Sequence, residues 1–125
     1  MKKNNDIQLS FLVNMKNSAA VLEEVKYNFI YHYSITDFYD VRMTFKDFND
    51  LYDGKYPGYR RCNTKFHDKI HSTDALLAMS RLIDGYNIKN PKFPVNKVRI
   101  ALIATILHDT GYIQTMGNWG RSSIL

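Results

Sequence analysis

The sequence predicts an all-α protein, and two observations favour this fold class. Apolar residues recur at helical intervals in several segments, and one segment near the C-terminus is apolar nearly all round. Pairs of turn-forming residues, Asp53-Gly54 and Pro57-Gly58, and a linker from Pro91 to Pro94 separate these segments. At 125 residues and 14.6 kDa, the chain suits a single domain with one hydrophobic core.

The first helix is expected to begin at Asn17 or Ser18, either of which can cap it, and to run to about Tyr33. Alternating aromatic residues between Tyr27 and Tyr33 also fit a strand, but the preceding alanine, leucine and glutamate residues favour a helix. Residues 1–16 are expected to form a loosely held arm. Residues 17–125 then form the helical domain.

A second, shorter helix is expected after Thr44, which can cap it, with Phe45, Phe48, Leu51 and Tyr52 as its apolar positions. The glycines and prolines that follow break the chain, so residues 53–62 are expected to form a loop.

Two longer helices complete the prediction. The third is expected to open at Asn63 or Thr64 and to stop at Gly85. The fourth covers residues 98–107 and is expected to be buried, because it is apolar nearly all round, and to end at Gly111.

Composition limits the function classes. The formal net charge of +5 suits an anionic partner such as a phosphate ester. Cys62 is the only cysteine, which excludes an intramolecular disulfide and a CxxC zinc site and fits a reducing compartment. The apolar stretch near the N-terminus is too short for a signal peptide or a membrane span, so a cytoplasmic protein without a membrane partner is expected.

Histidines at two places are candidates for chemistry. His67 and His71 are four residues apart, so a helix places them on one face about one turn from each other. This spacing alone is weak, since surface or capping histidines often show it. The HExxH pattern of zinc proteases is absent, because Asp68 and Lys69 follow His67.

The pair His108-Asp109 closes the apolar fourth helix. It places a carboxylate beside the negative end of the helix dipole and close to the core, where an uncompensated charge costs several kcal/mol. A divalent cation would compensate it, with imidazole and carboxylate as ordinary ligands for Zn²⁺, Mn²⁺ or Fe²⁺. The alternatives are that Asp109 pairs with Arg99, Arg60 or Lys69, or that it caps the Thr110-Gly111 turn.

Taken together, these residues resemble the HD-domain metal-dependent phosphohydrolases, in which a helix-borne histidine precedes a His-Asp pair at the end of a second buried helix. The run from Ala101 to Tyr112 matches that second element, and the stretch from Phe66 to Asp74 is similar to the Tyr-His-Asn-x-x-His-Ala-x-Asp element of cyclic-nucleotide phosphodiesterases. Phe66 stands in place of the tyrosine and Asp68 in place of the asparagine. The resemblance covers about residues 59–112.

The resemblance implies an HD-domain-like helical bundle and a hydrolase that acts on a nucleotide phosphodiester or phosphomonoester through metal-activated water. It implies that His71, His108 and Asp109 bind a divalent metal ion (Mn, Mg, Zn or Fe), and that His67 protonates the leaving oxygen. Arg60, Arg61 and Lys69 precede or lie along the histidine-bearing helix and are expected to draw the phosphorylated substrate towards the metal; the alternative is a solvated basic face. A nucleic-acid partner is not expected, and a homodimer remains open.

The family pattern ends with a later aspartate ligand, whereas residues 110–125 contain no Asp, Glu or His. The expected bundle is therefore incomplete at the C-terminus. The alternative function is a catalytically incomplete HD module that binds a nucleotide or a protein partner.

Overall fold

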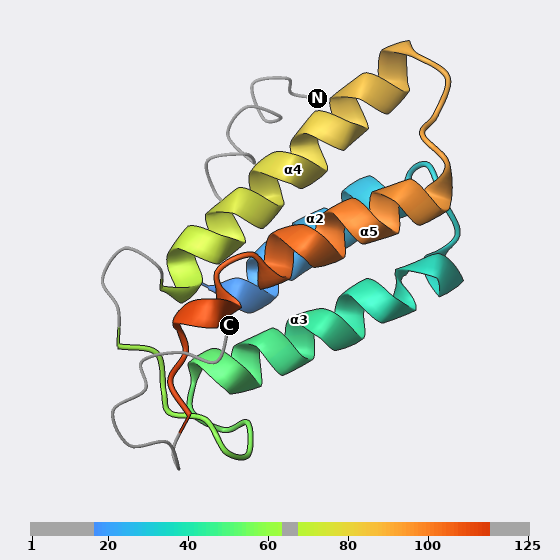
Figure 1. Cartoon of the computed structure of the whole chain (residues 1–125). Coiled ribbons are helices and arrows are strands. Elements are labelled where there is room, and N and C mark those ends of the chain that lie inside the picture. The colour runs from blue at the N-terminus through green and yellow to red at the C-terminus, as the bar shows by residue number, and fades with distance from the viewer. Residues whose placement is uncertain (1–16, 64–67, 116–125) are drawn as a thin grey trace.

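The fold is an all-α bundle, as the sequence predicts (Figure 1). The computed structural model describes residues 17–63 and 68–115. Within these residues, four α-helices and two short 3-10 helices follow one another: α2 (Ser18–Ile30), η1 (Ile35–Phe38), α3 (Tyr39–Tyr52), α4 (Lys69–Lys89), α5 (Val95–Leu107) and η2 (Thr110–Tyr112). Among the described residues, the single β contact is an isolated antiparallel bridge between Tyr59 and Thr115.

Helix α5 packs against both α4 and α3, and α2 packs against α4 on the far side of the view in Figure 1. The core lies where these helices meet. Its members are mostly aliphatic and phenylalanine side chains that are almost fully buried, among them Val25, Phe29, Phe45, Leu77 and Leu102. The predicted arm, residues 1–16, lies outside the described residues.

Helix α2 begins as predicted. The Asn17 side chain accepts hydrogen bonds from the backbone N–H groups of Ala19 (3.0 Å) and Ala20 (3.3 Å), which satisfies two donors that the helix itself leaves unpaired. The helix ends at Ile30 rather than near Tyr33, because the backbone of Ser34 is extended and its side chain caps η1.

Helix α3 starts at Tyr39, directly after η1, so the predicted start after Thr44 is wrong. Its apolar side extends further towards the N-terminus than expected, since Val41 is fully buried together with Phe45 and Phe48. The predicted loop over residues 53–62 is confirmed.

Helix α4 starts at Lys69, and the predicted start at Asn63 or Thr64 is wrong. Asp68 caps it, accepting a hydrogen bond of 2.9 Å from the backbone N–H of His71. The prediction that Gly85 stops the helix is also wrong. The helix continues to Lys89 because the next turn carries Asn87, which is buried. Its amide nitrogen and its amide oxygen each form a hydrogen bond.

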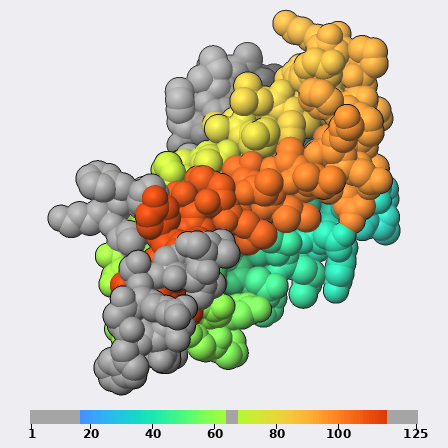
Figure 2. All heavy atoms as spheres, viewed as in Figure 1, coloured from blue at the N-terminus to red at the C-terminus, as the bar shows by residue number. Residues whose placement is uncertain are grey.

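Helix α5 is confirmed, and the prediction that it is buried holds for one of its sides only. Val98, Leu102 and Ile106 point into the core, whereas Ile100 is 67% exposed. Figure 2 shows the atoms of α5 on the surface between those of α4 and α3. The helix ends at Leu107, before Gly111, because residues 110–112 tighten into η2. Within residues 17–63 and 68–115, no helix is both long and apolar enough to cross a bilayer.

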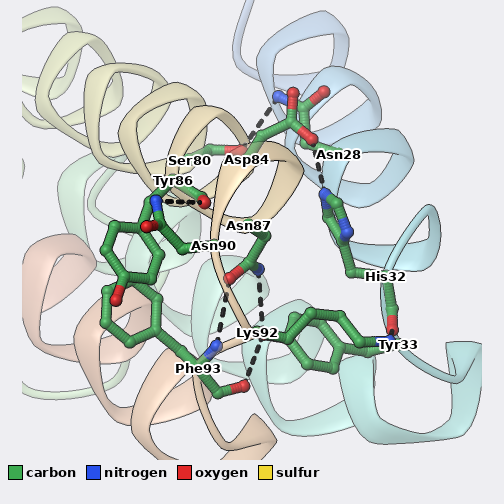
Figure 3. A network of polar contacts seen from close by, with 10 residues as sticks. All are labelled: Asn28, His32, Tyr33, Ser80, Asp84, Tyr86, Asn87, Asn90, Lys92 and Phe93. Atoms are coloured by element: carbon green, nitrogen blue, oxygen red, sulfur yellow. Dashed lines mark hydrogen bonds and ion pairs between the residues drawn. The ribbon is translucent and has the colours of Figure 1, made fainter.

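A network of polar contacts holds the C-terminal end of α2 to α4 and to the linker before α5 (Figure 3). His32 Nε2 lies 2.8 Å from Asp84 Oδ1, and the Tyr33 hydroxyl donates to the Phe93 carbonyl oxygen at 2.6 Å. The Asn87 amide donates to the Tyr33 hydroxyl at 2.9 Å. The network fixes one end of the bundle, away from the His108-Asp109 pair.

Candidate metal centre

The candidate metal centre lies where the start of α4 meets the end of α5. His71 belongs to the first turn of α4, His108 is the C-cap of α5, and Asp109 follows it. Because α4 packs along α5, the two histidines come together although they are far apart in the sequence. Their ring centroids are 5.5 Å apart.

Three potential ligand atoms converge in this centre. The Nε2 atoms of His71 and His108 each lie 3.3 Å from Asp109 Oδ2. One ligand atom from each of the three residues lies within 4.8 Å of the others. The structure thus brings together the three residues that the sequence singles out as metal ligands.

The backbone fixes the protonation pattern of His108. Its Nδ1 atom lies 2.7 Å from the carbonyl oxygen of Thr105, and since a carbonyl only accepts, Nδ1 must carry the hydrogen. In the neutral imidazole, Nε2 then presents a lone pair towards the Asp109 carboxylate. Two acceptors that face each other need a proton or a metal ion between them, and a histidine oriented by a backbone carbonyl is typical of a metal ligand.

The distances are compatible with a shared metal ion. Bonds of about 2.0–2.2 Å from zinc to nitrogen and oxygen place two ligands of one ion about 3.0–3.5 Å apart at ordinary coordination angles. Both histidines lie 3.3 Å from Asp109 Oδ2. The same two residue types form a direct contact elsewhere, where His32 Nε2 lies only 2.8 Å from Asp84 Oδ1. That shorter distance is the usual length of a charge-assisted hydrogen bond.

Burial makes Asp109 the anchor of the centre. Its side chain is 11% exposed, whereas those of His71 and His108 are 50% and 37% exposed. A buried carboxylate is stabilised by a nearby positive charge, and the N-terminal end of α4 lies next to it through His71. The more exposed imidazoles leave the centre open towards solvent, as a reacting ligand requires.

Two of the three cations that the sequence offers as alternative partners for Asp109 pair with other carboxylates. Arg99 pairs with Asp40, and Lys69 pairs with Asp53 at 2.8 Å. The Asp109 side chain does not cap η2. The two histidines are ionisable groups that lie directly against the Asp109 carboxylate.

Two buried hydroxyl groups lie beside the centre. The Tyr52 hydroxyl and the Ser72 hydroxyl are both buried and neighbour each other, but neither forms a hydrogen bond of good geometry. Burial raises the pKa of Tyr52 to about 12; the neighbouring Ser72 hydroxyl opposes this rise, and the charges of Cys62 and Asp109 add to it. A buried hydroxyl without a partner costs about 1–3 kcal/mol, so its presence next to a carboxylate calls for a role.

The predicted substrate-binding residues Arg60, Arg61 and Lys69 do not share one environment. Lys69 is held by Asp53, while Arg60 and Arg61 are exposed on the loop before α4. The backbone N–H of Arg60 donates to the Gln114 carbonyl oxygen at 2.7 Å, which fixes that loop beside the segment after η2. His67 lies outside the described residues.

Sequence reasoning missed Tyr52, Ser72 and the orienting carbonyl of Thr105. Ser72 follows His71 directly, which is the one signal that the sequence offers for it. Tyr52 lies at the end of α3 as an ordinary apolar position, and only the packing of α3 against the other helices shows its proximity to the centre.

Comparison of the chain with protein-family models, with curated proteins and with solved structures finds no match. The HD-domain interpretation therefore stays a prediction that depends on the motif residues themselves.

Proposed function

We propose that the protein is a metal-dependent phosphohydrolase of the HD type, with a nucleotide phosphodiester or phosphomonoester as its substrate. The observation that carries this proposal is the convergence of His71 Nε2 and His108 Nε2 on Asp109 Oδ2, each at 3.3 Å. Imidazole and carboxylate together suit Zn²⁺, Mn²⁺ and Fe²⁺. Three protein ligands with positions left over are the arrangement of catalytic rather than structural metal sites.

The roles follow from the chemistry of phosphoester hydrolysis. A divalent cation bound by these three residues would activate a water molecule and neutralise charge on the phosphate oxygens. Attack forms a bond from the water oxygen to phosphorus, and the bond from phosphorus to the leaving oxygen breaks. We assign to His67, from the sequence pattern, the proton that the leaving oxygen takes up. Arg60 and Arg61, both exposed, supply positive charge for an anionic substrate.

The test is hydrolysis of bis-p-nitrophenyl phosphate by the full chain, with and without added Mn²⁺ or Zn²⁺. We expect metal-dependent release of nitrophenolate that His71→Ala and Asp109→Ala abolish. His67→Ala should keep the metal and lose turnover. The matched control is His32→Gln, which changes a histidine that also contacts a carboxylate but lies at the other end of the bundle.

A second outcome corresponds to the alternative function. If the protein binds metal through His71 and Asp109 but hydrolyses neither diesters nor monoesters, it is a catalytically incomplete module. Metal binding that survives both ligand substitutions would show that the centre is assigned to the wrong residues.

A further inference from the structure

A cleft of about 320 Å³ lies between α3, the loop after it and the segment from Leu107 to Ile113. Ligand pockets of proteins range from about 300 to 1,000 Å³, so the cleft has room for one small molecule of the size of a nucleoside. Thr110 lines it and follows the metal ligand Asp109 directly.

Two tyrosines from one loop form the aromatic side of the cleft. Tyr56 and Tyr59 both line it, with ring centroids 6.0 Å apart and planes inclined by 57°, so their rings do not stack on each other. Tyr56 is 40% exposed. A tyrosine ring that is not covered by its neighbour offers a face on which a planar ligand can stack.

The loop that carries these tyrosines is anchored at both ends. The Asp50 carbonyl oxygen accepts hydrogen bonds from the backbone N–H groups of Lys55 (2.7 Å) and Tyr56 (3.1 Å). The backbone N–H of Cys62 donates to the Tyr52 carbonyl oxygen at 3.0 Å, and Tyr59 forms a β-bridge with Thr115. The aromatic side is therefore held in place before any ligand arrives, which lowers the entropic cost of binding.

Helix α3 supplies polar groups to the same cleft. Asp47 and Thr44 are one helical turn apart and both line the cleft, next to the apolar side chains of Phe48 and Leu51. Lys46, the neighbour of Asp47, pairs with Asp50 instead. An ionised carboxylate only accepts hydrogen bonds, so Asp47 selects a ligand edge that carries donors.

We propose that this cleft binds the base of a guanine nucleoside, stacked on Tyr56 and hydrogen-bonded to Asp47. The guanine edge carries two adjacent donors, the ring N1–H and the exocyclic amine, which match the two oxygens of one carboxylate. Adenine presents one donor beside an acceptor at the same edge and matches less well. The inference does not depend on the proposed hydrolase function, since neither the metal nor a phosphate takes part.

The test is binding of guanosine, inosine and adenosine to the metal-free full chain, measured by chemical-shift changes in ¹H–¹⁵N NMR spectra. We expect guanosine to bind more tightly than inosine, which lacks the exocyclic amine, and more tightly than adenosine. The shift changes should be centred on residues of the cleft. Because the protein is metal-free and the ligands carry no phosphate, a failure of the hydrolase proposal does not change this result.

Variants separate the two contacts. Tyr56→Ala should weaken guanosine binding by about tenfold or more through loss of stacking, whereas Tyr56→Phe keeps the ring and should bind like the parent protein. Asp47→Asn should remove the preference for guanosine over adenosine. The control is Tyr27→Ala, which removes an exposed tyrosine on α2 that does not line the cleft. Equal binding of the three nucleosides, absence of binding, or guanosine binding that both Tyr56→Ala and Asp47→Asn leave unchanged would overturn the proposal.

Discussion

His71 Nε2 lies 3.3 Å from Asp109 Oδ2, and this contact joins the first turn of α4 to the end of α5. His108 reaches the same carboxylate oxygen at the same distance. Two imidazole nitrogens that approach one carboxylate oxygen are the relationship from which the metal-binding predictions follow.

Substitution of one ligand should remove the metal. We expect the full chain to bind about one equivalent of Mn²⁺ or Zn²⁺. His71→Ala and Asp109→Asn should lose this metal, because a neighbouring group outside the ligand set cannot take the place of the lost ligand atom. Isothermal titration calorimetry after removal of metal with a chelator measures this. His32→Gln, which changes the 2.8 Å contact with Asp84, should bind metal as the parent protein does. Unchanged stoichiometry in Asp109→Asn would contradict the prediction.

Metal binding should also stabilise the fold, because a centre that joins two helices exists only in the native state. At a free metal concentration of 100 times Kd, the stabilisation is about 2.7 kcal/mol, which corresponds to a rise in Tm of roughly 10 °C for a domain of this size. Thermal unfolding followed by circular dichroism, with metal and with chelator, measures the shift. The Asp109→Asn variant should show none, and a full shift in that variant would place the metal elsewhere.

Two tyrosines near opposite ends of the bundle, the half-buried Tyr33 and the buried Tyr52, should respond differently to loss of the hydroxyl. Tyr33 uses its hydroxyl twice, towards Phe93 and Asn87, so Tyr33→Phe should destabilise the protein by about 1–3 kcal/mol. The Tyr52 hydroxyl is buried and forms no hydrogen bond of good geometry, so Tyr52→Phe should leave the metal-free protein equally stable or more stable. Urea unfolding of both variants without metal makes the comparison.

The same pair of variants tests whether Tyr52 supports the metal centre. Outer groups that orient metal ligands typically change metal affinity by about 10- to 100-fold when they are removed. We expect Tyr52→Phe to lower the affinity for Mn²⁺ in this range and Tyr33→Phe to leave it unchanged. Equal affinities in the two variants would mean that the Tyr52 hydroxyl does not act on Asp109.

The sequence predicts the parts of this molecule that depend on neighbours along the chain. The capping of α2 by Asn17 is such a part, and so is the loop after Tyr52, where glycines and prolines break the helix. The start of α4 was misplaced because Asp68 was assigned only to the histidine motif, although an aspartate is also a strong N-cap.

The candidate centre likewise has residues that the sequence predicts and residues that only the structure places. His71, His108 and Asp109 stand out in the sequence because their pattern is chemical, and the structure brings the three together. The positions of Tyr52 and of the cleft at Tyr56 and Asp47 depend on how α3 packs against the end of α5, which no local pattern encodes. The exposed face of α5 was missed for a related reason, since an apolar sequence does not tell which of its sides a neighbour covers.

High pH should destabilise the protein through Tyr52. Burial raises the pKa of Tyr52 in the folded state to about 12, from an ordinary value of 10.0 that applies to the unfolded chain. Above pH 10 the unfolded chain loses this proton while the folded protein keeps it, so the free energy of unfolding falls as the pH rises from about 10 to about 12. Below pH 10 Tyr52 is protonated in both states and its contribution to the free energy of unfolding is constant.

Urea unfolding at pH 9 and at pH 11 should therefore show a smaller loss of stability in Tyr52→Phe than in the parent protein. Tyr27→Phe, which changes an exposed tyrosine, should lose as much stability as the parent, and an equal loss in all three proteins would show that Tyr52 ionises as readily in the folded protein as in the unfolded chain.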